Sequence, residues 1–134
     1  MDARLADALK TVADALGAID RDDFERACEM IGAATVIGIY GCGREGLQMR
    51  GFAMRLFHLG LDVGCLGDVS MPRLGEGDLL VVSAGPGELA TVTAHMSTAR
   101  AADARVLFIT AQPDTPAARI ADQVLIVPAQ TMAS

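Results

Sequence analysis

The sequence predicts an α/β fold in which a five-stranded parallel sheet lies between two layers of helices. Three observations support this prediction: five short apolar segments recur along the chain, helical segments separate them, and the apolar residues are mainly aliphatic. Hydrophobic residues make up 51% of the chain, whereas aromatic residues make up only 4%. Strands that are apolar without alternation are buried on both faces, as in a parallel sheet. One helical crossover per strand then gives a doubly wound, three-layer α/β/α architecture.

Two helices are predicted before the first strand. The apolar residues of segment 3–16 recur at helical spacing on one face, and they are Leu5, Ala8, Leu9, Val12 and Leu16. Asp20, followed by Asp23 three residues later, is typical of a helix N-terminus, so a second helix is expected over residues 20–31.

The five strands and three further helices follow in alternation. The predicted strands are residues 35–40, 62–66, 78–83, 105–110 and 123–127. The predicted helices between them are residues 45–59, 88–102 and 115–121. A chain of 134 residues is long enough for one core, so we expect a single domain over 1–134. It comprises N-terminal helices in 1–33 and a sheet region in 34–131.

Composition restricts the classes of partner. The net charge is −6 and Lys10 is the only lysine, so the clustered basic residues that bind nucleic acid are absent. No apolar run approaches the ~20 residues of a membrane helix, and the first residues lack a signal-peptide pattern. Three cysteines without paired spacing indicate free thiols in the cytoplasm, and neither they nor the two histidines have metal-ligand spacing. Small molecules and further copies of the chain remain as partners, and no cofactor or metal is expected.

A glycine-rich loop, GCGREG at 41–46, directly follows the first predicted strand. In a dinucleotide-binding module such a loop holds a pyrophosphate, and Asp68, about 20 residues further on, would bind a ribose. Two helices precede this strand and no substrate domain follows the last one, which argues against that interpretation. Ligands of parallel sheets bind beyond the carboxyl ends of the strands. The predicted site is therefore built from 41–46, 67–70, 84–88 and 111–115.

Three stretches, GCGREGLQMRGFAMRLFHLGLDV, GDLLVVSAGPGE and ITAQPDTPAARIADQVLIVPAQT, resemble the sugar isomerase (SIS) domain, particularly the 6-phospho-3-hexuloisomerases. The similarity is collinear over residues 34–131. Its most specific parts are FAMRLFHLG at 52–60 and A-D-x-V-x-I-V-P-A at 121–129. The resemblance implies a flavodoxin-like doubly wound fold and a phosphosugar ligand. It also implies a homodimer or homotetramer with sites at subunit contacts.

The two loops that hold the phosphate in this family depart from its pattern. The family reads G-x-G-R-S-G and S-G-S-G-E-T, whose hydroxyls and helix N-terminal amides bind the anion. Here Glu45 replaces the serine of the first loop, and Ala84, Pro86 and Leu89 replace the three hydroxyl residues of the second. Each lost hydrogen bond to a charged phosphate costs roughly 1.5–3 kcal/mol. The sequence therefore predicts weakened phosphate binding.

The predicted ligand-binding residues come from both loops. They are Gly41, Cys42, Gly43, Arg44, Glu45, Gly46, Ser83, Ala84, Gly85, Gly87 and Glu88. Arg44 is a candidate for partial compensation, with a surface arginine paired to Glu45 or Asp68 as the alternative. Cys42 is a candidate nucleophile at a helix N-terminus, with a small residue in a tight turn as the alternative.

Catalytic residues are less clear. Related isomerases take their base from a carboxylate on a helix after the last strand, and we expect that helix to be absent because the sequence stops at Ser134. Glu45, Glu88 and His58 of a neighbouring subunit remain as weak candidates. His58 lies some 13 residues into its helix, about 20 Å from the loop of its own subunit. His95 is expected on an exposed or interface face.

Three functions stay open. One is an isomerase of altered substrate range, and the second is a carbohydrate-derivative-binding module without turnover, which is slightly favoured. The third is a different, uncharged ligand that Arg44 and Glu45 contact.

Overall fold

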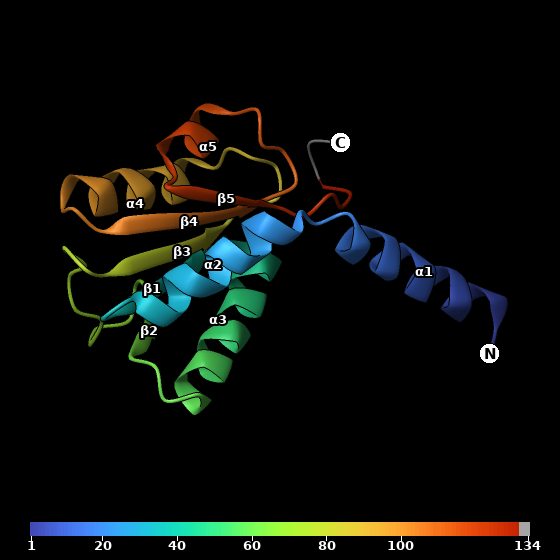
Figure 1. Ribbon diagram of the computed structural model, residues 1–134, viewed down its shortest axis with the longest axis horizontal. Coiled ribbons are helices and arrows are strands. Elements are labelled where there is room, and N and C mark those ends of the chain that lie inside the picture. Colours follow the sequence, from blue (N-terminus) through green and yellow to red (C-terminus); the bar gives the residue numbers. More distant parts are fainter. Residues whose placement is uncertain (132–134) are drawn as a thin grey trace.

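A computed structural model describes residues 1–131 and confirms the α/β fold (Figure 1). Its helices are α1 (Ala3–Gly17), α2 (Arg21–Ala33), α3 (Gly43–His58), α4 (Ala90–Ala101) and α5 (Pro116–Ile120). Its strands are β1 (Ile37–Gly41), β2 (Val63–Cys65), β3 (Leu79–Ser83), β4 (Arg105–Thr110) and β5 (Gln123–Ile126). Every predicted element is present, with ends shifted by two residues or fewer. The expectation about a helix beyond the last strand concerns a region outside the described residues.

All five strands are parallel, in the order β2-β1-β3-β4-β5. The chain moves outward from β1 to β2 and then returns to place β3 on the other side of β1. In the pairing of β1 with β3, Ile37 lies opposite Leu79 and Gly41 opposite Ser83. The direction of winding therefore changes between β1 and β3, which is where doubly wound sheets bind their ligands.

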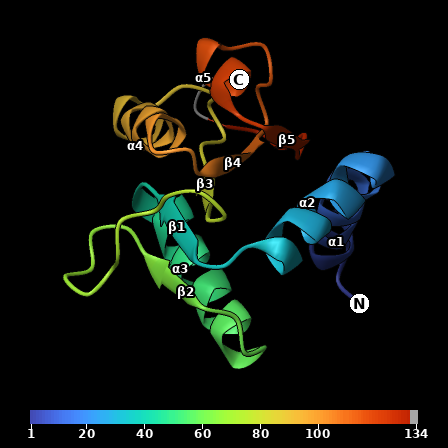
Figure 2. The ribbon, with the colours of Figure 1, turned by 60° about the vertical axis from the view of Figure 1, so that its left-hand side comes forward.

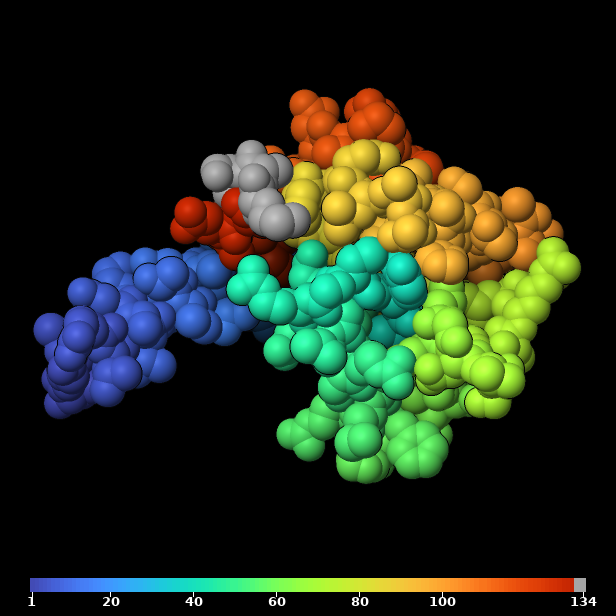
Figure 3. Space-filling view, turned by 180° about the vertical axis from the view of Figure 1, so that it is seen from behind, coloured from blue at the N-terminus to red at the C-terminus, as the bar shows by residue number. Residues whose placement is uncertain are grey.

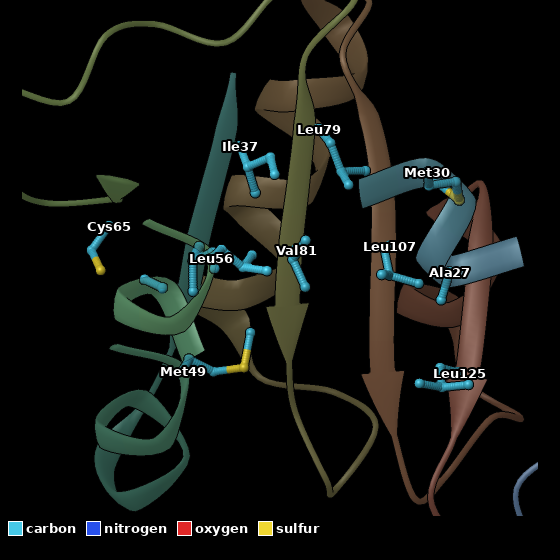
Figure 4. Close-up of a cluster of buried hydrophobic side chains, with 12 residues drawn as sticks. Ala27, Met30, Ile37, Met49, Leu56, Cys65, Leu79, Val81, Leu107 and Leu125 are labelled. Atoms are coloured by element: carbon cyan, nitrogen blue, oxygen red, sulfur yellow. The ribbon is translucent and has the colours of Figure 1, made fainter. Parts of the chain in front are cut away.

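Helices cover both faces of the sheet, with α2 and α3 on one side and α4 and α5 on the other (Figure 2). On the first side, Met30 of α2 and Leu56 of α3 pack with Val81 and Leu107 of the strands (Figure 4). The core on the second side includes Val92, Met96 and Phe108, all fully buried. All five residues of β3 are buried, as expected for the central strand of a three-layer fold.

Helix α1 differs from the others because none of its residues is buried. The large residues of its predicted apolar face, Leu5, Leu9, Val12 and Leu16, are 57–60% exposed, and Ala8 is exposed as well. The helix stands away from the sheet and its covering helices (Figures 1 and 3). The amphipathic pattern is thus present, but no part of residues 1–131 covers it.

Aspartate carboxylates accept hydrogen bonds from backbone N–H groups in several loops and at helix ends. Asp20 accepts a hydrogen bond from the backbone N–H of Asp23 at 2.9 Å, which confirms it as the N-cap of α2. Asp78, just before β3, accepts from the N–H groups of Val36 at 3.1 Å and Gly75 at 2.8 Å. These bonds fix the loops at the amino edge of the sheet, and sequence patterns did not predict the role of Asp78.

Candidate functional site

A cavity of about 680 Å³ opens at the carboxyl edge of the sheet. Residues of the segments 42–45, 83–89, 109–111 and 127–131 line it, so the segments after β1, β3, β4 and β5 all contribute. This is the place that the parallel topology predicts for a ligand.

The glycine pattern after β1 has a packing role. Cys42 is the N-cap of α3, and the helix begins directly at Gly43. A Cβ atom on Gly46 would lie 2.5 Å from the carbonyl oxygen of Gly41, closer than any side chain can approach. The first and last glycines of GCGREG therefore let α3 start against the end of β1, which needs no ligand to explain it.

Glu45, in the first turn of α3, links this loop to the end of β3. The Ser83 hydroxyl donates to its Oε1 at 2.6 Å, and the Gly85 N–H lies 2.9 Å from Oε1 and 3.1 Å from Oε2. The carboxylate of Glu45 therefore takes up one donor from the end of β3 and one from the second loop. Gly85 belongs to the loop where the family pattern places a phosphate, and Ser83 directly precedes that loop.

Two residues of the second loop, Gly87 and Glu88, form hydrogen bonds outside the cavity. Gly87 has φ of 92°, and its carbonyl accepts from the Thr115 hydroxyl at 2.8 Å. Glu88 accepts from the Ala117 N–H and from the Thr93 hydroxyl, both at 3.0 Å. Its carboxylate thus braces α4 and α5 and does not line the cavity. Glu88 is consequently poorly placed as a base for a ligand bound there.

Arg44 lines the cavity, is exposed, and takes part in none of the ion pairs among residues 1–131. The alternative pairing with Glu45 or Asp68 is not observed. Asp68 pairs instead with Arg50, with 3.3 Å between Oδ1 and Nη1. Arg44 is therefore a cation at the cavity that no described acidic side chain neutralises.

The eleven predicted ligand-binding residues fall into two groups. Six line the cavity: Cys42, Gly43, Arg44, Glu45, Ser83 and Gly85. Five shape the loops without lining it: Gly41, Gly46, Ala84, Gly87 and Glu88. The prediction did not include Thr110 or the segment 127–131, although the carboxyl ends of β4 and β5 were a signal for them. Of the expected segment 67–70, Gly67 and Asp68 line a separate cavity of about 220 Å³.

The histidines lie outside the cavity. His58 is the last residue of α3 and is exposed, so it is not packed in the core of residues 1–131, and a contact with a neighbouring subunit stays a prediction. His95 was expected on an exposed or interface face, but it is half-buried, with its ring centroid 4.4 Å from that of Tyr40. Tyr40 of β1 packs against the imidazole on the face of the sheet that α4 covers, so His95 is not fully exposed, and an interface position is not tested by the single chain.

All three cysteines are free thiols. Cys42 Sγ lies 3.2 Å from the hydroxyl oxygen of Thr91. Burial raises the pKa of the Cys65 thiol, while the Arg50 guanidinium partly opposes the shift. Within residues 1–131 no cluster of three or more acidic, histidine or cysteine side chains could hold a metal ion. No helix in that range has the length and apolarity to cross a membrane.

Comparisons with known proteins agree with this geometry. No protein-family model matches the chain. A 3-hexulose-6-phosphate isomerase of Mycobacterium gastri is 39% identical over 118 residues, which cover 88% of this chain and 59% of the relative. The Vibrio vulnificus NanR protein, solved with ManNAc-6P, has a TM-score of 0.80 at 26% identity and covers 92% of this chain and 48% of that one.

A third comparison names the domain. The sugar isomerase domain of an RpiR transcription factor from Sphaerobacter thermophilus has a TM-score of 0.76 at 20% identity, covering 96% of this chain and 75% of that one. The parallel sheet and its carboxyl-edge cavity agree with these likenesses. The named relatives and the structure neighbours support the sugar isomerase (SIS) domain family for this chain, which is similar to 3-hexulose-6-phosphate isomerases.

Proposed function

We propose that this chain is a single SIS domain that binds a sugar phosphate or related carbohydrate derivative in the carboxyl-edge cavity, without efficient turnover of its own. The observation that carries the proposal is the cavity itself, which lies at the switch point of an SIS sheet and is lined by Arg44, a cation without an ion pair among residues 1–131. The relative from Mycobacterium gastri is named for an isomerase, but this chain spans only 59% of its length, so activity is not transferred with the fold.

The phosphate loops support weak rather than tight binding of a phosphate. Four positions that carry hydroxyls in the family pattern are Glu45, Ala84, Pro86 and Leu89, and Pro86 also has no backbone N–H. Loss of these donors removes charge-assisted hydrogen bonds of roughly 1.5–3 kcal/mol each. Glu45 adds a negative charge at the helix N-terminus that an anion would otherwise use.

The alternative is an active isomerase of altered specificity. Moving a carbonyl along a sugar passes through an enediol and needs a base within hydrogen-bond reach of the substrate. Among the described residues, Glu45 is the one carboxylate that lines the cavity, and Ser83 and Gly85 already hold it. The named isomerase activity of the Mycobacterium gastri relative favours this alternative.

Calorimetric titration with fructose 6-phosphate, combined with an isomerisation assay, tests the proposal. We expect binding in the millimolar range and no turnover above the uncatalysed rate. A ligand at 100 times its dissociation constant would stabilise the fold by about 2.7 kcal/mol, so a large thermal shift at low millimolar ligand would show a working phosphate loop. Turnover would establish the isomerase alternative.

We also propose a cytoplasmic homodimer or homotetramer, in which a second copy covers the apolar face of α1. Leu9 and Leu16 are 58% and 60% exposed in the single chain, and burying such side chains contributes about 1.5–3 kcal/mol each. Light scattering of a Leu9→Asp, Leu16→Asp variant should show dissociation. Thr11→Asp, on another face of the same helix, is the matched control. A wild-type chain that is monomeric at micromolar concentration would defeat the proposal.

A further inference from the structure

At the inner end of the cavity, where β1 and β3 end, two donor groups are already occupied by Glu45. A ligand there meets hydrogen-bond acceptors. The Ser83 hydroxyl proton is committed to Glu45 Oε1 at 2.6 Å, which leaves the Ser83 oxygen only its lone pairs. The Gly85 N–H is committed to the same carboxylate. The next residue, Pro86, has no N–H to contribute.

Glu45 retains capacity to accept more. A carboxylate has about four lone-pair positions. Oε1 receives two donors, whereas Oε2 receives only the longer, shared contact from Gly85 at 3.1 Å. No ion pair among residues 1–131 involves Glu45, so its charge is not neutralised by a described cation. The free lone pairs belong to a residue that lines a cavity of about 680 Å³.

A phosphate is a poor partner for this arrangement, because it is itself negative and offers acceptor oxygens. A hydroxyl or a protonated amine is a good partner, because each brings a hydrogen to a charged acceptor. Arg44, which no acidic side chain of the described residues neutralises, lines the same cavity and supplies the complementary cation. The cavity thus contains both a carboxylate acceptor and a guanidinium donor.

We propose that Glu45 and Ser83 form a subsite for a hydrogen-bond-donating group of the ligand, a sugar hydroxyl or a protonated amine, and that any phosphate on the ligand pairs with Arg44 instead. This inference rests on the proposed function, because it states which part of the same cavity binds which group of the ligand. It reverses the orientation that the family pattern implies, since the phosphate no longer lies between the two loops.

The test follows the Gly85 N–H signal by ¹H–¹⁵N NMR while the full chain is titrated with inorganic phosphate, glucose, glucosamine and glucose 6-phosphate. The sugars should shift the Gly85 signal, and inorganic phosphate should leave it unchanged. A preference of tenfold or more for glucosamine over glucose would identify an amine as the donor. Equal affinities would identify a hydroxyl.

Two variants and a control sharpen the test. Glu45→Gln keeps the shape but removes the charge, and it should weaken binding of glucose and glucosamine by about tenfold. Arg44→Gln should weaken only glucose 6-phosphate. Glu29→Gln, an exposed site on α2 away from the cavity, changes the net charge equally and should leave every affinity unchanged.

The outcomes separate this inference from the function on which it rests. If inorganic phosphate shifts Gly85, or if only phosphorylated sugars bind and Glu45→Gln strengthens them, the loops hold phosphate and the inference is wrong while the function survives. If none of the sugars binds, with or without phosphate, the proposed function itself fails.

Discussion

Two carboxylates, one at each edge of the sheet, form similar bonds and have different consequences. Asp78 at the amino edge accepts from the backbone N–H groups of Val36 and Gly75. Glu45 at the carboxyl edge accepts from the Ser83 hydroxyl and the Gly85 N–H. Asp78 lines none of the cavities described above, whereas Glu45 lines the cavity of about 680 Å³.

The comparison indicates that the space around a carboxylate, and not the hydrogen bonds it accepts, decides whether the residue mainly stabilises the fold or is available to a ligand. Donors that lose a carboxylate in a closed turn are left without a partner. Donors that lose one beside a cavity can be solvated by incoming water, which is nearly as good a partner. The carboxylate of Asp78 is therefore expected to stabilise the fold at the amino edge, whereas that of Glu45 at the carboxyl edge lines the cavity.

The largest effect is expected from Asp78→Ala. Two half-buried N–H groups lose their acceptor, and each unsatisfied donor costs about 1–3 kcal/mol, so the free energy of unfolding should fall by about 2–6 kcal/mol. Urea unfolding measures the change. Asp62→Ala is the matched control, because Asp62 is exposed at the same edge and its side chain has no partner among residues 1–131. Equal stability of the two variants would show that the hydrogen bonds of Asp78 do not stabilise the fold.

An intermediate effect is expected from Glu45→Ser on anion binding. The substitution removes a negative charge, returns a hydroxyl, and releases the Ser83 hydroxyl and the Gly85 N–H toward the cavity. Affinity for a hexose phosphate should rise by about tenfold, close to 1.4 kcal/mol. The gain should shrink at high salt, as a charge effect does.

Calorimetric titration of both proteins measures this gain, and an isomerisation assay accompanies it. We expect no turnover by the variant, because the substitution adds no base. Unchanged affinity would mean that Glu45 does not control the anion site. Turnover would reveal a base elsewhere in the chain.

The smallest effect is expected from Glu45→Ala on stability. Water in the cavity can replace the carboxylate at Ser83 and Gly85, so the loss should stay below about 1 kcal/mol. The same urea measurement as for Asp78→Ala gives a direct comparison. A loss of unfolding free energy as large as that of Asp78→Ala would show that Glu45 mainly stabilises the fold. It would contradict the distinction between the two edges.

The sequence by itself determined the helices, the strands and the edge of the sheet at which the cavity opens. Continuous apolar segments such as 105–110 become buried parallel strands, and their boundaries were predicted within two residues. The GCGREG loop was correctly placed after β1. These features are local, because periodicity, helix capping and glycine conformation depend on residues close in sequence.

Only the tertiary structure decided what the loop residues do. Glu45 contacts Ser83, 38 residues away, because the strand order places β3 beside β1. The same order brings 127–131 to the cavity wall and packs the ring of Tyr40 against His95. Whether Glu45 would face solvent, Arg44 or the end of β3 could not be predicted, since a local pattern does not specify which distant strand becomes its neighbour. That neighbour decides which donors the carboxylate meets.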